Sequence, residues 1–155
     1  MTAYEELLQE ADDEGIEVLE FTFKSDIKGL YSDNCIAINR KLSTTAEKKC
    51  VLAEELGHHY TTVGNIIDIK NVSNKKQELI ARKWSYEKLV PLETIIMASF
   101  ECCTSIYELV EYLDITEEFL KDTLNHYQTK YGLYTEVDNY CIYFNPLTVC
   151  RYNYK

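Results

Sequence analysis

The segment from Ala53 to His58 differs at a single position from the H-E-x-x-H motif, which builds hydrolytic zinc sites on a helix. Residues 54 and 58 would lie one above the other on one face of a helix, about 6 Å apart, so they could share a metal ion. Glu55 would lie beside that face, where the motif has its general base. The departure from the motif is Glu54, which stands in place of the first histidine.

A third candidate ligand is Glu78, which follows His58 on the next predicted helix. A zinc site of the gluzincin type takes two ligands from the motif helix and a glutamate from the following helix. Three protein ligands then leave the fourth position for a water molecule. The sequence thus offers Glu54, His58 and Glu78 as one possible set around a divalent ion.

An ordinary structural explanation of the same pattern exists. Apolar and polar residues separate onto opposite sides of the motif helix, and a solvated polar face would account for Glu54, Glu55 and His58. Two residues argue against this explanation. Val51 lies within the polar face, which suggests that something covers it, and Gly57 costs about 1 kcal/mol inside a helix unless a neighbour packs closely there.

The spacing of apolar and capping residues predicts both helices of the candidate site. Thr44 and Glu47 form a capping-box pattern that opens the motif helix, which runs to about residue 61. Asn74 and Gln77 predict the start of the next helix, and Pro91 predicts its end at residue 90.

A small sheet is predicted before the motif helix. A helix over residues 4–14 is followed by a strand over 16–23 and by a hairpin that pairs 29–31 with 35–39. An extended peptide often binds by adding to the edge of a sheet. We therefore expect a substrate segment to lie along the second hairpin strand and to contact Ile36, Ala37, Ile38 and Asn39.

The C-terminal third predicts a helical module with a terminal hairpin. Helices over 106–113 and 117–131 resemble a helix-turn-helix, and strands over 133–137 and 140–144 would follow them. A DNA-binding regulator is one interpretation of this module. The second helix begins with Glu117 and Glu118, however, which would place negative charge against phosphates. The expected organisation is a domain over 1–100 and this module over 101–155.

The charge and composition of the chain indicate which classes of partner it can bind. A net charge of -10 on 155 residues opposes attraction to nucleic acids and to anionic membranes, so a protein partner fits better. The sequence shows no apolar run long enough to cross a bilayer, and its start is acidic, unlike a targeting segment. The six cysteines form no C-x-x-C pair, which favours reduced thiols. These features predict a soluble, cytoplasmic protein.

The residues quoted above carry a family resemblance. The run from Cys50 to His58, the following Tyr60-Thr61-Thr62, and the later segment from Asn74 to Trp84 resemble the ImmA/IrrE family of phage and mobile-element metallopeptidases. The strand segment from Gly29 to Asn39 strengthens the resemblance, which covers residues 1–100 best.

The resemblance implies an α+β fold with a zincin-like (minigluzincin) domain, a small β-sheet and active-site helices. It makes Glu55 the general base and His58 and Glu78 metal ligands, with Glu54 at the first ligand position. The implied metal is Zn²⁺, with Mn²⁺ or Fe²⁺ as alternatives because a second carboxylate is harder and more anionic than imidazole. Helix rotation aims His59 about 100° away from His58, so a packed or exposed histidine is its commoner role and a transition-state donor is the alternative. His126 is expected at the surface.

The resemblance also implies a substrate and an activity. Members of the family on mobile elements cleave a cognate helix-turn-helix repressor, so one repressor protein is the expected substrate. An inactive zincin fold that acts as an antirepressor by binding alone is the alternative, because Glu54 departs from the motif.

Overall fold

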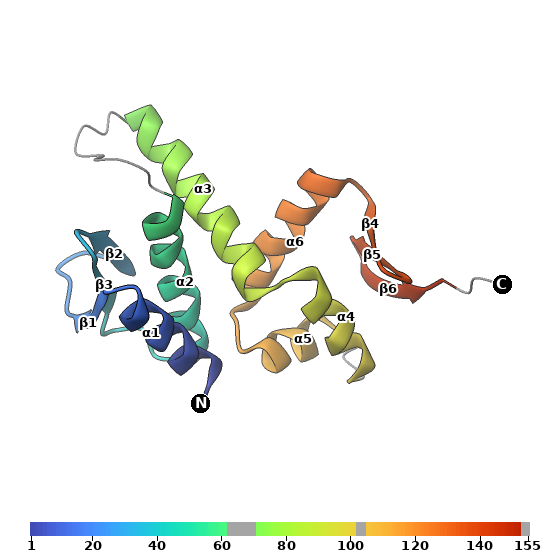
Figure 1. The fold of residues 1–155 in the computed structure, drawn as a ribbon, viewed down its shortest axis with the longest axis horizontal. Coiled ribbons are helices and arrows are strands. Elements are labelled where there is room, and N and C mark those ends of the chain that lie inside the picture. Colours follow the sequence, from blue (N-terminus) through green and yellow to red (C-terminus); the bar gives the residue numbers. More distant parts are fainter. Residues whose placement is uncertain (62–70, 102–104, 153–155) are drawn as a thin grey trace. The chain divides into compact units, whose positions relative to one another are not determined.

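The computed structural model describes residues 1–61, 71–101 and 105–152, which form six α-helices and six β-strands (Figure 1). The predicted α+β class is confirmed. The chain divides into two compact units, Met1–Ser85 (unit 1) and Tyr86–Lys155 (unit 2), and each is described by itself. This division falls at Ser85, whereas the sequence places a domain boundary near residue 100, and that boundary stays a prediction.

Unit 1 is a three-stranded sheet with helices against one face. Its elements are α1 (Ala3–Asp13), β1 (Glu17–Phe21), β2 (Gly29–Ser32), β3 (Cys35–Asn39), α2 (Thr45–Thr61) and the first part of α3 (Asn71–Leu89). The strand order is β1-β3-β2, with β1 parallel and β2 antiparallel to the central β3. Helix α1 contacts β1 and α2 contacts both β2 and β3, so the sheet has one helix-covered face.

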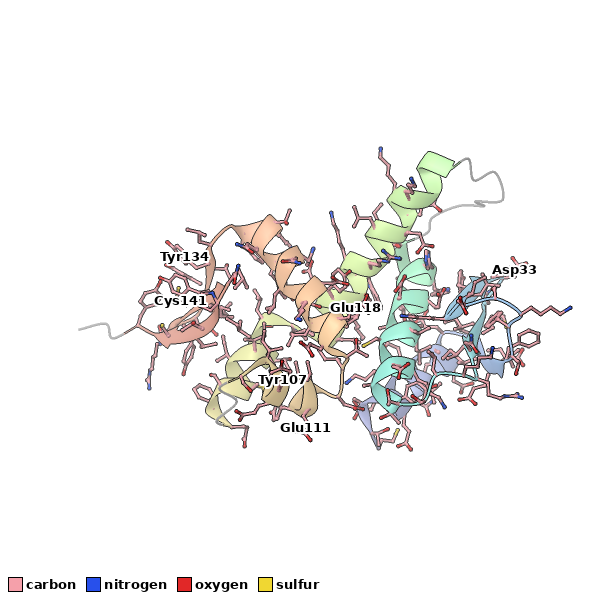
Figure 2. All side chains as sticks on the ribbon, turned by 180° about the vertical axis from the view of Figure 1, so that it is seen from behind. Asp33, Tyr107, Glu111, Glu118, Tyr134 and Cys141 are labelled. Carbon is pink, nitrogen blue, oxygen red and sulfur yellow. The ribbon has the colours of Figure 1, made fainter. Side chains whose placement is uncertain are left out.

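Local sequence explains the turns of unit 1. Thr2 and Glu5 form a capping box at the start of α1, and Gly15 follows its end with a φ of 74°, a conformation that glycine adopts without strain. Asp33 and Asn34 connect β2 to β3 with φ values of 46° and 59°, as a tight hairpin turn requires (Figure 2, which labels Asp33). The predicted first helix and hairpin are confirmed.

The two helices of the candidate site differ in how well the sequence predicts them. The Thr44 hydroxyl accepts a hydrogen bond of 3.1 Å from the Glu47 backbone N–H, and α2 follows it as predicted. Helix α3 is already formed at Asn71, so the predicted cap at Asn74 is wrong, and that residue lies inside the helix. The break at Pro91 is confirmed, because α3 ends at Leu89.

Unit 2 holds helices followed by a second sheet. Its further elements are α4 (Leu92–Phe100), α5 (Ile106–Leu113), α6 (Glu117–Tyr131), β4 (Tyr134–Val137), β5 (Tyr140–Phe144) and β6 (Leu147–Arg151). Ser105 and Thr116 cap α5 and α6 through their side chains, as predicted. The predicted pairing of β4 with β5 is confirmed, and β6 extends this hairpin into a three-stranded antiparallel sheet. Neither α4 nor β6 is predicted by the sequence patterns.

Each unit buries its own apolar side chains. In unit 1, helix α2 contacts β3, and Leu52 and Leu56 of the helix and Ile36 and Ile38 of the strand are all fully buried. In unit 2, the Tyr127 hydroxyl donates a hydrogen bond of 2.7 Å to the Val90 carbonyl.

His126 belongs to the interior of unit 2. Its side chain is only 8% exposed, and its Nε2 lies 2.8 Å from Oε2 of Glu87. The predicted surface position of His126 is therefore wrong, because it packs under a carboxylate from α3.

No helix in the described residues combines the length and apolar character that a membrane span needs.

Candidate metal centre

Helices α2 and α3 bring the three predicted metal ligands together. Glu54 and His58 lie one turn apart on α2, and Glu78 reaches them from α3. One ligand atom from each residue can be chosen so that all three lie within 4.8 Å of one another. Within this cluster, Nε2 of His58 lies 3.2 Å from Oε1 of Glu78.

A glycine sets the distance between these two helices. A Cβ atom at Gly57 would overlap the backbone carbonyl of Ala81, closer than real side chains approach backbone. Gly57 immediately precedes the ligand His58, and Ala81 lies one turn after Glu78. The close packing suggested by a glycine inside the motif helix is confirmed, and it occurs at the level of the ligands.

Glu55 lies in a buried position beneath strand β2. It is 8% exposed, and a Cβ added at Gly29 would lie 3.2 Å from its Oε1 and 2.5 Å from Cγ1 of Val51. The strand thus covers the polar face of α2, which explains why Val51 lies there. Burial, and then the charges of Glu54 and Glu78, raise the pKa of Glu55 to about 8.

The cluster carries an excess of negative charge that one cation offsets. Arg82, one turn after Glu78 on α3, donates from Nε to Oε1 of Glu54 across 3.2 Å. The motif and the capping patterns of the sequence do not point to Arg82. The signal that could have found it is its spacing of four residues from Glu78, which places both side chains on one face of a helix.

His59 points to a different set of partners from His58. Its Nδ1 lies 2.8 Å from the Tyr31 hydroxyl of β2, and its Nε2 lies 3.8 Å from Oε2 of Glu14. These contacts agree with a packed histidine between β2 and the end of α1. The role of His59 as a transition-state donor stays a prediction.

The residues predicted to bind substrate lie in the central strand of the sheet. Strand β3 pairs with β1 on one side and β2 on the other, so neither of its edges can accept another strand. Ile36 and Ile38 are fully buried and Asn39 is 5% exposed. Ala37 lies on the opposite face. Among the described residues the free edge nearest to α2 belongs to β2.

The donor set fits a divalent cation. Two carboxylates and an imidazole are ligands that Zn²⁺, Mn²⁺ and Fe²⁺ accept. Ligand atoms around a tetrahedral zinc ion are separated by roughly 3.4 Å, given bond lengths near 2.1 Å. The 3.2 Å between Nε2 of His58 and Oε1 of Glu78 is close to this value, and a ligand atom of Glu54 lies within 4.8 Å of a ligand atom of each.

Unit 2 shows no comparable chemistry in its described residues. A largely apolar hollow of about 770 Å³ lies among α4, α5, α6 and the turn between β5 and β6, with Lys121 as its one charged lining residue. The predicted helix-turn-helix pair is present as α5 and α6, and Glu118 lies in the first turn of α6 (Figure 2). This acidic start disfavours contact with a phosphate backbone.

A family model described as the IrrE N-terminal-like domain of the M78 peptidases matches residues 11–125. No curated protein matches the chain with significance.

Proposed function

Because the chain belongs to the M78 peptidase family, with its IrrE N-terminal-like domain, we propose that it is a metal-dependent endopeptidase that cleaves one repressor protein at a specific site. The match spans more than half of the chain and includes every residue of the candidate centre. Family membership and the α+β architecture together support a zincin-like fold for this chain.

The observation that carries the proposal is the convergence of Glu54, His58 and Glu78 beside a buried Glu55. A divalent cation bound there would polarise a peptide carbonyl and acidify a water molecule. Glu55 would accept the proton of that water and pass it to the departing amine. Glu55 must be ionised for this role. A neighbouring dication would favour the ionised carboxylate, whereas burial and then the charges of Glu54 and Glu78 favour the protonated form.

The free edge of β2 is the best place for the substrate backbone. In the antiparallel pair of β2 and β3, the Asn39 N–H donates to the Lys28 carbonyl, so alternation turns the N–H groups of Leu30 and Ser32 inward. The backbone groups of Gly29 and Tyr31 then point toward the free edge. A peptide that paired with them would lie next to Gly29, whose added Cβ would be only 3.2 Å from Oε1 of Glu55. We therefore assign to β2 the substrate contacts expected from Ile36 to Asn39.

The identity of the substrate rests on the family resemblance. Relatives on mobile elements act on helix-turn-helix repressors, and a site that recognises an extended segment suits such a protein. The net charge of -10 makes nucleic acid a poor direct partner.

Glu54 favours a second candidate function. A carboxylate in place of the first histidine weakens the resemblance at the residue that matters most for zinc. A protein that kept the fold and lost the metal would act on the repressor by binding alone.

Metal analysis of the purified protein separates the two functions. We expect one equivalent of metal after supplementation with zinc, manganese or iron, and its loss in His58→Ala and Glu78→Ala. Glu111→Ala, an exposed position on α5, is the matched control and should keep the metal (Figure 2). A wild-type protein that takes up none of the three metals, but still binds the repressor, would contradict the peptidase and support the antirepressor.

A further inference from the structure

We infer that Arg82 is a positioning residue of the metal centre, which holds Glu54 in the ligand position that histidine occupies in the H-E-x-x-H motif. The inference rests on the proposed metal-dependent function. Through this contact the chain could keep a working site despite its departure from the motif.

Arg82 contacts one ligand of the cluster from the helix that carries another. Arg82 lies one turn beyond the ligand Glu78 on α3, and its Nε is 3.2 Å from Oε1 of Glu54 on α2. A carboxylate has two oxygens, so a hydrogen bond at Oε1 leaves Oε2 able to bind a cation. Arg82 can therefore contact Glu54 while Glu54 serves as a ligand.

Charge explains why such a contact is needed here. Glu54 and Glu78 carry two negative charges within a 4.8 Å cluster, and these repel each other when no metal is bound. Arginine stays protonated at all relevant pH values, so Arg82 always offsets one of them. The ligand set with Arg82 then has a formal charge of -1, which equals that of two neutral histidines and one glutamate.

Both side chains of the Arg82–Glu54 pair are accessible to solvent, which indicates that the pair contributes little to folding stability. The Arg82 side chain is 53% exposed and that of Glu54 is 30% exposed. Ion pairs this accessible contribute little to the free energy of unfolding. The consequence of the contact should therefore appear in metal binding, because it keeps Glu54 turned toward His58 and Glu78 before the metal arrives.

The test measures the dissociation constant of zinc by chelator competition, for the full chain. Removing a residue that orients a ligand typically weakens metal binding on the order of 10-fold to 100-fold. We therefore expect Arg82→Gln to raise the dissociation constant of zinc by at least about tenfold. Arg82→Lys keeps the charge without the guanidinium geometry and should lie in between. Lys83→Gln removes one positive charge from the neighbouring exposed position and should leave the dissociation constant unchanged.

Two further measurements exclude a general structural effect. The thermal midpoint of the metal-free Arg82→Gln variant should match that of metal-free wild type. The visible absorption spectrum of the cobalt-substituted variant should differ from that of cobalt-substituted wild type, because this spectrum reports ligand geometry. In a Glu54→His background the carboxylate of residue 54, which Arg82 contacts in the wild type, is absent. Adding Arg82→Gln there should leave zinc affinity unchanged or raise it.

The outcomes distinguish this inference from the proposed function. Wild-type protein that binds no metal would overturn both. Wild-type protein that binds zinc, together with an Arg82→Gln variant that binds it equally well or more tightly, would overturn the role of Arg82 alone. If Arg82→Gln weakened zinc binding equally in wild type and in Glu54→His, the role of Arg82 would also be overturned, because the effect would not depend on Glu54.

Discussion

Gly57 on α2 packs directly against the backbone of Ala81 on α3, with no room between them for even a methyl group. The contact lies beside His58 and one turn from Glu78, so it determines whether these ligands can reach a common ion. A residue without a side chain is thus part of the reason why the cluster forms.

We expect Gly57→Ala to destabilise the protein and to weaken metal binding together. Forcing a methyl group into this contact should cost about 1–3 kcal/mol, partly offset by the helix preference of alanine of about 1 kcal/mol. Chemical denaturation and chelator competition measure the two effects.

Gly15→Ala is an informative comparison for this variant. Gly15 has a φ of 74°, and a Cβ atom added there would meet nothing within 4 Å, so its substitution should cost stability through the backbone alone. Its metal affinity should stay at the wild-type value. Loss of stability in Gly57→Ala without any change in metal affinity would show that this contact does not position the ligands.

Glu55→Gln should separate chemistry from metal binding. The amide cannot accept the proton of water, so cleavage of the repressor should fall by roughly 10²-fold to 10⁴-fold. Metal content should remain at one equivalent, because Glu55 is not among the clustered ligands. Activity within a few-fold of wild type would remove Glu55 from the role of general base.

The metal-free protein should lose stability as the pH rises, because of Glu55. The pKa of this carboxyl is raised from 4.5 to about 8 in the folded chain, so the folded state binds more protons than the unfolded state between these values. Ionisation in the buried site should therefore lower the free energy of unfolding between about pH 4.5 and pH 8, by at most about 5 kcal/mol.

Denaturation in the presence of a chelator at pH 5 and pH 9 tests this dependence. Residue 55 cannot ionise in Glu55→Gln. The free energy of unfolding of this variant should therefore exceed that of wild type by more at pH 9 than at pH 5. Glu111→Gln, at an exposed position, serves as the control. Parallel stability profiles for wild type and Glu55→Gln would show that Glu55 titrates normally.

Substitutions in β2 should reveal whether its free edge binds substrate. Tyr31→Pro removes a backbone N–H that points outward, so it should raise KM for the repressor and leave the fold largely intact. Leu30→Pro removes an N–H that pairs with β3 and should destabilise the sheet. Tyr31→Phe keeps the N–H and loses the hydroxyl contacts with His59 and Asn34. Equal KM values for Tyr31→Pro and Tyr31→Phe would argue against pairing at this edge.

The sequence predicts the local parts of the site well because short-range patterns determine them. The Thr44 cap and the apolar spacing after it suffice to place α2, and turn residues such as Asp33 and Asn34 suffice to place the hairpin. Helix α4 is missed because Leu92–Phe100 is apolar over most of its length and shows no clear helical period after Pro91.

Contacts between distant elements lie beyond such patterns. The parallel pairing of β1 with β3 makes the strand containing Ile36 central, and no local feature of that strand distinguishes a centre from an edge. The hydrogen bond from Arg82 to Glu54 depends likewise on how α2 crosses α3, which the Gly57 contact determines.

The two outer strands of the first sheet differ in their protection against self-association. Strand β1 carries Glu17 and Glu20, whereas β2, Gly29–Ser32, has no charged side chain to repel another copy of the chain. A strand edge that can pair with a peptide can also pair with the same strand of another molecule. Concentrated samples should therefore oligomerise through β2, and a bound peptide there should keep them monomeric.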